Sequence, residues 1–252
     1  MLDNLMQRKS VRRYEKKEPS RETIEKIVRA GQQAPFTAQL YSVLLSRKGR
    51  HQFGAPLLFT FCADLHKLEK IMAKRNWEVA TNDLSLLLFA IQDAVLAAGQ
   101  MVTAAESLGL GSCFLGGAPY QAEKIIEDYN LPPRVFPIVQ LVMGFPAENP
   151  PPRPRYPLEF TLFEEKYPDF SDGEIKEAMR AMDQGYLEEG YYERRTGIID
   201  LEVDREETFT YENYSWTEHI SRKWGQWLKD EEEILSKLQA CGFDIRGALK
   251  KE

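Results

Sequence analysis

The sequence predicts an α+β sheet domain that continues into a helical extension. Short apolar runs typical of buried strands alternate with segments of helical periodicity, and all of these runs fall in the first 150 residues. The chain has 252 residues, of which 43% are hydrophobic, which is enough for one large core but short for two. We therefore expect one domain with additions.

The first predicted element is an amphipathic helix over residues 21–33. Ser20 is its N-cap, because a serine hydroxyl accepts a hydrogen bond from the free backbone N–H groups of a first turn. Ile24 and Ile27 recur at helical spacing, and Pro35 ends the helix.

Two strands and a long helix follow. Residues 42–46 and 57–63 are short apolar runs, and each predicts a buried strand. Asp83 is placed to cap a helix that runs to Leu108 and stops at Gly109.

This helix is apolar on nearly all of its faces between residues 84 and 102. That length would span a membrane, but the segment carries Gln92, Asp93 and Gln100, and an ionised aspartate near a bilayer centre costs roughly 2.5–3.5 kcal/mol. We expect a buried helix that needs a partner on every side. We expect one of these surfaces to pack against a second copy of the chain, which predicts a homodimer.

The rest of the core completes the sheet. Residues 112–115 predict a strand, 121–129 a short helix, and 137–143 another buried strand. The run at 146–155 contains five prolines, so it cannot form regular structure, and it marks the end of the core. Two more helices are expected at 173–189 and 216–239, joined by an acidic, tyrosine-rich stretch.

Charge divides the chain in the same place. Residues 1–150 hold 18 basic and 15 acidic side chains, whereas residues 151–252 hold 15 and 24. We assign residues 1–156 to the core and residues 157–252 to a C-terminal extension of the same domain. We expect the two parts to have different functions.

Several classes of protein are disfavoured. A net charge of -6 disfavours a general binder of nucleic acid or of anionic membranes. His51, His66 and His219 lie far apart and share no metal-ligand spacing, so no metal site is expected.

The three cysteines indicate a compartment. Cys62, Cys113 and Cys241 are odd in number and form no C-x-x-C motif, which favours a reducing environment over a disulfide scaffold. The charged opening segment has none of the apolar run that a secretory signal needs. Both observations predict a cytoplasmic protein.

The first candidate site is Arg8-Lys9-Ser10-Val11-Arg12, which places three cations and a hydroxyl within five residues. If the segment is helical, Arg8 and Arg12 share one face. Guanidinium groups and hydroxyls suit a phosphate, because charge-assisted hydrogen bonds are short and strong. Taken alone, the segment also fits a solvated basic stretch.

The second candidate site is Arg153-Pro154-Arg155, after the last predicted strand. The prolines stiffen two guanidinium groups, which lose less entropy on binding an anion. In isolation, a positively charged surface loop is an equally good interpretation.

The third is the glycine-rich segment 109–117, which combines a helix stop, a strand and the pair Gly116-Gly117. Glycines allow backbone N–H groups to approach a flat ligand. The order differs from a dinucleotide-binding G-x-G-x-x-G, because here the first glycines end a helix. Ser112 is in no G-x-S-x-G motif, and Cys113 has no recognisable base, which disfavours a hydrolase.

Taken together and in this order, the segments resemble the FMN-dependent nitroreductase family. The matching motifs are R-K-S-V-R-R-Y at 8–14, Ala34-Pro35, A-I-Q-D-A-V-L-A-A-G-Q at 90–100, E-S-L-G-L-G-S-C-F-L-G-G at 106–117 and M-G-F-P-A-E-N-P-P-P-R-P-R at 143–155. With Y-S-W-T-E-H-I-S-R-K at 214–223, the chain is most similar to the oxygen-insensitive NADPH nitroreductase and flavin reductase subgroup.

The resemblance implies a nitroreductase-like α+β fold, in which helices flank a central, mainly antiparallel sheet and two subunits intertwine. It implies two FMN sites at the subunit interface. The residues that the family pattern places at the FMN phosphate and ribityl chain are Arg8, Ser10, Arg153 and Arg155, with Lys9 as a weaker candidate.

For the flavin ring, the resemblance implies that Arg12 lies near N1 and O2, where a cation stabilises the charge on reduced flavin. The backbone of Leu115, Gly116 and Gly117 would approach the N5 edge. The other subunit would contribute the turn from Ala34 and Pro35 to Thr37, together with Gln39.

The implied chemistry is a ping-pong hydride transfer. NAD(P)H reduces the flavin and leaves, and the acceptor then takes the same place. No catalytic side chain is required, and protons can come from water. The acceptor class is a small aromatic or quinone-like molecule, namely a nitroaromatic, a quinone or free flavin.

The chain departs from the subgroup's pattern near the substrate. Ala118-Pro119-Tyr120 stands where the subgroup has an arginine, and Glu188 and Glu189 stand where it has a cation for the extra phosphate of NADPH. Arg194 and Arg195 lie nearby and could substitute. The acidic segment 200–212 and the short loop near His51 have no assigned role.

These departures leave two alternatives open. The first is a nitroreductase-fold enzyme with another acceptor, such as a disulfide, an enone or a halogenated aromatic, and an unusual electron donor. The second is a flavin-binding redox sensor with little turnover.

Overall fold

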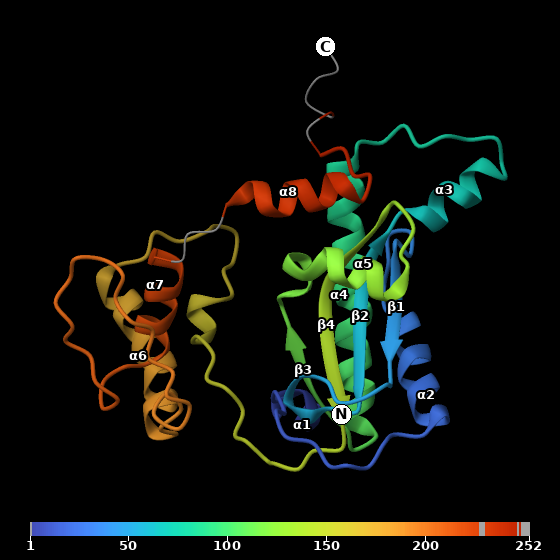
Figure 1. Cartoon of the computed structure of the whole chain (residues 1–252). Coiled ribbons are helices and arrows are strands. Elements are labelled where there is room, and N and C mark those ends of the chain that lie inside the picture. The colour runs from blue at the N-terminus through green and yellow to red at the C-terminus, as the bar shows by residue number, and fades with distance from the viewer. Residues whose placement is uncertain (1, 227–229, 246, 248–252) are drawn as a thin grey trace. The chain divides into compact units, whose positions relative to one another are not determined.

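A computed structural model describes residues 2–226, 230–245 and 247, which fall into two units (Figure 1). The sheet unit comprises Met1–Pro151 and Asp230–Glu252, and the helical unit comprises Pro152–Lys229. The boundary lies inside the proline-rich run at 146–155. The assignment of both parts to one domain stays a prediction.

The sheet unit is built on four strands in the order β1-β2-β4-β3, and every neighbouring pair is antiparallel. Their bounds are β1 Tyr41–Ser46, β2 Leu57–Asp64, β3 Gly111–Leu115 and β4 Val135–Gly144. Each contains one of the predicted strands. The expected α+β class with an antiparallel sheet is therefore confirmed.

Helices α2 (Arg21–Gln32) and α4 (Asp83–Ser107) cover one face of the sheet (Figure 1). Phe59, Phe61 and Leu141 point from the strands into the core that these helices close. Gly31 of α2 lies so near α4 that an added Cβ would stand 2.5 Å from Met101 Cγ. The close approach of the two helices therefore requires glycine at this position.

Sequence patterns placed α2 correctly, including its cap. The hydroxyl of Ser20 accepts the backbone N–H of Thr23 at 3.1 Å, and the helix ends before Pro35. Helix α4 also ends where predicted. Gly109 follows the C-cap Leu108 and adopts a φ of +76°, which ends the helix.

The predicted cap of α4 is wrong. Asn82 holds the extended cap position, and its side chain accepts the backbone N–H of Ser85 at 2.9 Å. Asp83 is already helical, and its carboxylate instead binds both terminal nitrogens of Arg134 at 2.7 Å. Arg134 lowers the pKa of Asp83 by hydrogen bonding to the ionised form. Because the Asp83 carboxylate is held in this ion pair, the side chain of Asn82 caps the helix instead.

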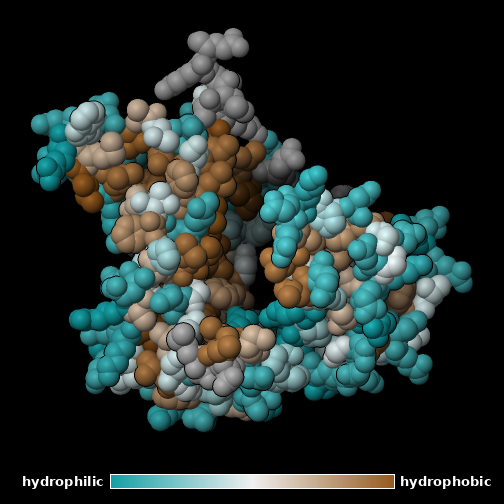
Figure 2. All heavy atoms as spheres, turned by 180° about the vertical axis from the view of Figure 1, so that it is seen from behind, coloured by the Kyte–Doolittle hydropathy of each residue, from teal (hydrophilic) through white to brown (hydrophobic). Residues whose placement is uncertain are grey.

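Among the described residues, α4 is the helix that is long and apolar enough to cross a membrane. One of its faces is buried against the sheet and includes Ala94, Ala98 and Met101. The other face exposes Leu88, Val95 and other apolar side chains, which Figure 2 shows gathered on the surface of the sheet unit. This uncovered face fits the prediction that α4 needs a further partner.

The opposite face of the sheet carries α5 (Ala122–Tyr129) (Figure 1). Helix α8 (Glu231–Ala240) packs at the end of the sheet through Leu238 against Phe136 and its neighbours. Two helices that hydrophobic periodicity did not predict, α1 (Leu2–Met6) and α3 (His66–Ala73), complete the sheet unit, together with the short 3-10 turns Gln52–Gly54 and Ala118–Gln121.

The helical unit contains the 3-10 turn Leu158–Phe160, α6 (Asp172–Glu188) and α7 (Trp216–Gln226). The single helix expected over 216–239 is wrong, because α7 and α8 are separate helices. Asp230 is extended and caps α8 by accepting the backbone N–H of Glu232 at 2.9 Å, so a new helix begins there. Residues 227–229 of the expected helix lie outside the described part of the chain.

Tyrosines from α6 and from the acidic linker form the core of the helical unit. Tyr186 of α6 is buried with Tyr192 and Tyr214 of the linker, and the Tyr192 ring centroid lies 5.8 Å from that of Tyr186 and 5.2 Å from that of Tyr214. The acidic segment is anchored by Arg222, whose guanidinium binds both oxygens of Glu207 at 2.6 and 2.7 Å. Segment 200–212 is therefore attached to α7 by a bidentate ion pair.

Candidate functional site

The basic segment 8–12 lies beside the start of β3. The backbone N–H of Val11 donates to the Ser112 carbonyl at 2.9 Å, and Ser10 forms an isolated parallel bridge with Ser112. Gly111 makes room for this contact, because an added Cβ would lie 2.5 Å from a methyl of Val11. The segment is not helical. Arg8 closes the turn after α1, because its backbone N–H donates to the Leu5 carbonyl at 3.3 Å.

Two guanidinium groups on this segment lie against aromatic rings, although Glu106 lies within electrostatic range of Arg8 and the Glu148 carboxylate accepts the Arg12 backbone N–H. Arg8 lies 6.0 Å from the centroid of the Phe114 ring, and Arg12 lies 5.8 Å from that of Phe53. Within the described residues neither forms a salt bridge. Lys9 differs, because its ammonium donates a hydrogen bond to Asn149.

A buried hydroxyl accompanies these cations. Ser112 is fully buried, and its Oγ has no hydrogen-bond partner among the described residues. A polar atom buried without a partner is costly, so its presence beside Ser10 indicates a place where a ligand or water completes the hydrogen bonding. Sequence reasoning weighed Ser112 only as a hydrolase nucleophile and missed this arrangement.

The glycine pair at the end of β3 leaves the backbone accessible. A Cβ added at Gly116 would meet no atom within 4 Å, and one at Gly117 would meet only Gln121, at 3.7 Å. Leu115 is partly exposed just before them. A flat ligand can therefore approach these peptide groups closely.

The loop that follows α2 is shaped by a buried carboxylate of α4. Asp93 is 1% exposed, and it accepts the backbone N–H groups of Thr37, Ala38 and Leu40 at 2.6, 3.2 and 2.9 Å. Gln39 adopts a φ of +52°, which is strained for a residue with a side chain. Three residues of this loop were predicted from the sequence to belong to the site. Pro35 and Gln39 are exposed, and Ala34 is buried.

Sequence reasoning treated Asp93 only as an argument against a membrane span. A lone acid in an apolar helix is the signal that could have identified it, because a buried carboxylate needs hydrogen-bond donors. The sequence does not show which donors these are.

Arg153 and Arg155 belong to the helical unit. The guanidinium of Arg153 binds the carboxylate of Glu189 and lies 4.1 Å from the ring centroid of Tyr191. Arg155 is exposed and donates to the carbonyls of Arg153 and Pro154 at 3.0 and 2.8 Å. Both therefore have partners within their own unit.

Glu189 is not the free carboxylate that its place in the sequence suggests. It binds Arg153 and also Arg194, the latter at 2.5 Å, and its side chain is 12% exposed. Glu188 accepts a hydrogen bond from Gln184 at 2.7 Å. Two arginines thus compensate the charge that was expected to repel a phosphate.

The helical unit also contains a small aromatic pocket of about 330 Å³. Its lining combines rings with cations and includes Tyr191, Trp216, His219 and Arg195. The guanidinium of Arg195 lies 4.7 Å from the ring centroid of Tyr191. Burial lowers the pKa of His219, so Arg195 and Lys223 supply the positive charge in this lining at neutral pH.

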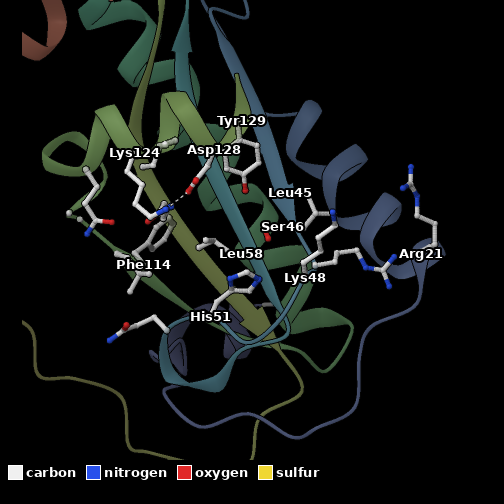
Figure 3. A pocket seen from close by; sticks show the side chains of 18 residues that line it. Arg21, Leu45, Ser46, Lys48, His51, Leu58, Phe114, Lys124, Asp128 and Tyr129 are labelled. Carbon is white, nitrogen blue, oxygen red and sulfur yellow. Dashed lines mark hydrogen bonds and ion pairs between the residues drawn. The ribbon is translucent and has the colours of Figure 1, made fainter. Parts of the chain in front are cut away.

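A larger cleft of about 1370 Å³ opens on the sheet face that bears α5. Figure 3 shows its floor, with Leu58 and Ser46 from neighbouring strands, and the imidazole of His51 directed toward them from the loop below. Phe114 and the Gly116–Gly117 backbone form one wall. The cleft therefore adjoins the accessible end of β3.

In the part of the chain that the structure describes, no three His, Cys, Asp or Glu side chains are grouped to hold a metal ion. The three cysteines are free and buried, and burial raises the pKa of the Cys62 thiol to about 12.

Comparison with known proteins identifies a family for this chain. The sequence model of the Nitroreductase family matches residues 5–48 and 48–145. An NADPH-dependent oxidoreductase of Staphylococcus aureus (strain USA300) is 31% identical over 253 residues, covering 93% of this chain and 94% of that protein.

Solved structures agree with this match. NfrA2 of B. megaterium superimposes with a TM-score of 0.81 at 23% identity, over 96% of this chain and 97% of that one. The NADPH:FMN oxidoreductase of Vibrio harveyi, complexed with NAD+, gives a TM-score of 0.75 at 21% identity, over 96% and 97%. The expected nitroreductase-like fold is confirmed.

Proposed function

The chain belongs to the nitroreductase family and is an NAD(P)H-dependent oxidoreductase, and from this premise we propose that it works as an FMN-containing homodimer. Its proposed acceptors are small aromatic or quinone-like molecules, namely nitroaromatics, quinones or free flavin. We place the enzyme in the cytoplasm, because its three cysteines are free.

One observation carries the cofactor assignment. Arg8 and Arg12 present two guanidinium groups that form no salt bridge among the described residues. They lie near the accessible glycine backbone at the end of β3 and near the Ser112 hydroxyl, which has no hydrogen-bond partner in the described part of the chain. A ligand with an anionic group at one end and a flat ring system fits this donor set. When bound, FMN accepts a hydride from reduced nicotinamide and returns it to an acceptor.

Each proposed residue has a distinct task. Arg8 and Ser10 bind the phosphate, with Lys9 as a weaker candidate, and the family pattern adds Arg153 and Arg155. Arg12 supplies the cation that stabilises negative charge on the reduced ring. The peptide groups of Leu115, Gly116 and Gly117 line the reactive edge, where the missing side chains allow close approach.

A second copy of the chain completes the proposed site. The loop of Ala34, Pro35 and Gln39, which Asp93 holds in shape, contributes from the partner subunit. The surface that would bring it there is the exposed face of α4, where Leu88, Val95 and Leu96 are 45–52% exposed. A face this apolar is stabilised by burial against its own copy.

NADPH is the proposed electron donor. The compensation of Glu189 by Arg153 and Arg194 removes the repulsion that an isolated carboxylate would exert on a phosphate. Arg195 remains at the edge of the aromatic pocket as the cation for the extra phosphate.

The alternatives make different predictions for one experiment. The purified protein is mixed anaerobically with NADH and, separately, with NADPH, while the visible absorption of the flavin is recorded in a stopped-flow instrument. Rapid bleaching by NADPH supports the proposal. A yellow protein that neither donor bleaches favours a redox sensor or an unusual donor, and a protein that cannot be reconstituted with FMN contradicts the cofactor assignment.

A further inference from the structure

We propose that the cleft on the α5 face of the sheet admits the electron acceptor, and that Lys48 at its rim selects acceptors that are aromatic and negatively charged. This inference rests on the proposed function, because it places the acceptor beside the β3 end that we assign to the flavin edge. It names a substrate class and a specificity residue on the loop between β1 and β2.

The cleft is large enough for a planar aromatic acceptor and lies beside the end of β3. Its volume of about 1370 Å³ exceeds the roughly 300–1,000 Å³ that a drug-sized ligand needs. One wall is the segment Phe114–Gly117, whose backbone is accessible at Gly116. A molecule in the cleft can therefore reach the proposed reactive edge without passing through the sheet.

The surfaces inside the cleft combine apolar and polar contacts. Phe114 is 37% exposed, and Leu58 contributes an aliphatic floor, so both can pack against a ring. On the same floor Gln140 donates to Thr60 Oγ1 at 3.0 Å. Burial raises the pKa of Tyr129, and hydrogen bonding to Ser46 and Thr60 partly offsets this.

The charges at the rim favour an anion. Four lysines and arginines line the cleft against a single carboxylate, Asp128. Three of the cations are paired: Arg21 with Glu25 at 2.6 Å, Arg47 with Glu18 at 3.6 Å, and Lys124 with Asp128 at 2.8 Å.

Lys48 has no ion pair within the described residues. Figure 3 shows it on the side of the cleft opposite Lys124. It is therefore the rim cation whose charge remains available to attract a ligand.

The test compares two quinones of similar shape, 1,4-naphthoquinone-2-sulfonate and the neutral 2-methyl-1,4-naphthoquinone. In Lys48→Gln we expect KM for the sulfonate to rise about two- to fivefold, the range for one exposed charge pair, while KM for the neutral quinone stays unchanged. Lys48→Glu should raise KM for the sulfonate further and leave KM for the neutral quinone unchanged. Lys70→Gln on α3 removes an equal charge outside the cleft, and it should change neither KM.

A binding measurement tests the site independently of turnover. Redox-inert 1-naphthalenesulfonate is titrated into the wild-type protein and the variants by isothermal calorimetry. We expect Lys48→Gln to weaken binding by the same factor, and added salt to reduce the difference between wild type and variant.

The outcomes separate the two proposals. Equal effects of Lys48→Gln on both quinones, or no effect on sulfonate binding, would overturn the inference while leaving a functioning reductase. A protein that binds no FMN would contradict the proposed function. In that case the naphthalenesulfonate titration still decides whether Lys48 attracts an aromatic anion.

Discussion

Asp93 and Thr37 lie 56 positions apart in the sequence, yet the Thr37 backbone N–H donates to the Asp93 carboxylate at 2.6 Å. This contact, with those to Ala38 and Leu40, joins the middle of α4 to the loop after α2. The carboxylate therefore links the helix proposed for the subunit interface to the loop proposed to reach across it.

The first prediction concerns this carboxylate. Asp93→Asn replaces one acceptor oxygen by an amide that cannot accept, so a buried N–H loses its partner. We expect the free energy of unfolding to fall by about 1–3 kcal/mol, measured by urea denaturation. FMN affinity should fall as well, because the loop loses its shape. Glu78→Gln, an exposed acid outside the loop, is the control, and equal stability of the two variants would contradict this account.

The second prediction separates the two arginines of the basic segment. Arg8→Ala should mainly weaken FMN binding, whereas Arg12→Ala should weaken binding and also slow flavin reduction, because it removes charge stabilisation of the reduced ring. Fluorescence titration with FMN measures the first effect, and anaerobic stopped-flow the second. Arg13→Ala is a neighbouring control, since that side chain is 73% exposed. Full flavin content and activity in both variants would refute the site.

The third prediction concerns the electron donor. Arg195→Ala should raise KM for NADPH about tenfold and leave KM for NADH nearly unchanged, because a charge-assisted contact to a phosphate contributes roughly 1.5 kcal/mol. Steady-state kinetics with both donors measure the ratio. Arg205→Ala removes an arginine from the acidic segment and should not alter it. A parallel loss with both donors would show that Arg195 does not read the extra phosphate.

The fourth prediction concerns the α4 face. Leu96→Glu should raise the dimer dissociation constant by at least about 30-fold, since burying an unpaired carboxylate costs roughly 2 kcal/mol or more. Sedimentation equilibrium measures this constant. Ile71→Glu changes a side chain on α3 that is 63% exposed, and it should leave association intact. An unchanged dimer in Leu96→Glu would place the interface elsewhere.

The fifth prediction follows from the ion pair of Glu207 and Arg222. Hydrogen bonds from Arg222 lower the pKa of Glu207 to about 2, from an ordinary value of 4.5. A lowered pKa in the folded state means that the ion pair stabilises the protein fully above pH 4.5, and that this contribution is lost as the pH falls to about 2. The difference in Tm between wild type and Glu207→Gln should therefore shrink over that interval. A difference that is constant with pH would contradict the pairing.

Local patterns were sufficient for most of the secondary structure. The strands of the sheet and helix α2 were predicted within a residue or two, because apolar periodicity, caps and proline act through neighbours in the sequence. Two of the errors have different causes. Asp83 is engaged by Arg134 from a distant part of the chain, and the C-terminal helix was divided where the local cap Asp230 begins a new one.

Motif order by itself determined the family, the fold and the residue types suited to an anionic, planar cofactor. Only the tertiary structure decided how those residues are paired. Glu189 is compensated by two arginines, the Ser112 hydroxyl is buried with no hydrogen-bond partner among the described residues, and Asp93 holds a loop 53 to 56 positions away. The physical reason is that charge compensation and desolvation depend on distances across the fold, which local sequence does not encode.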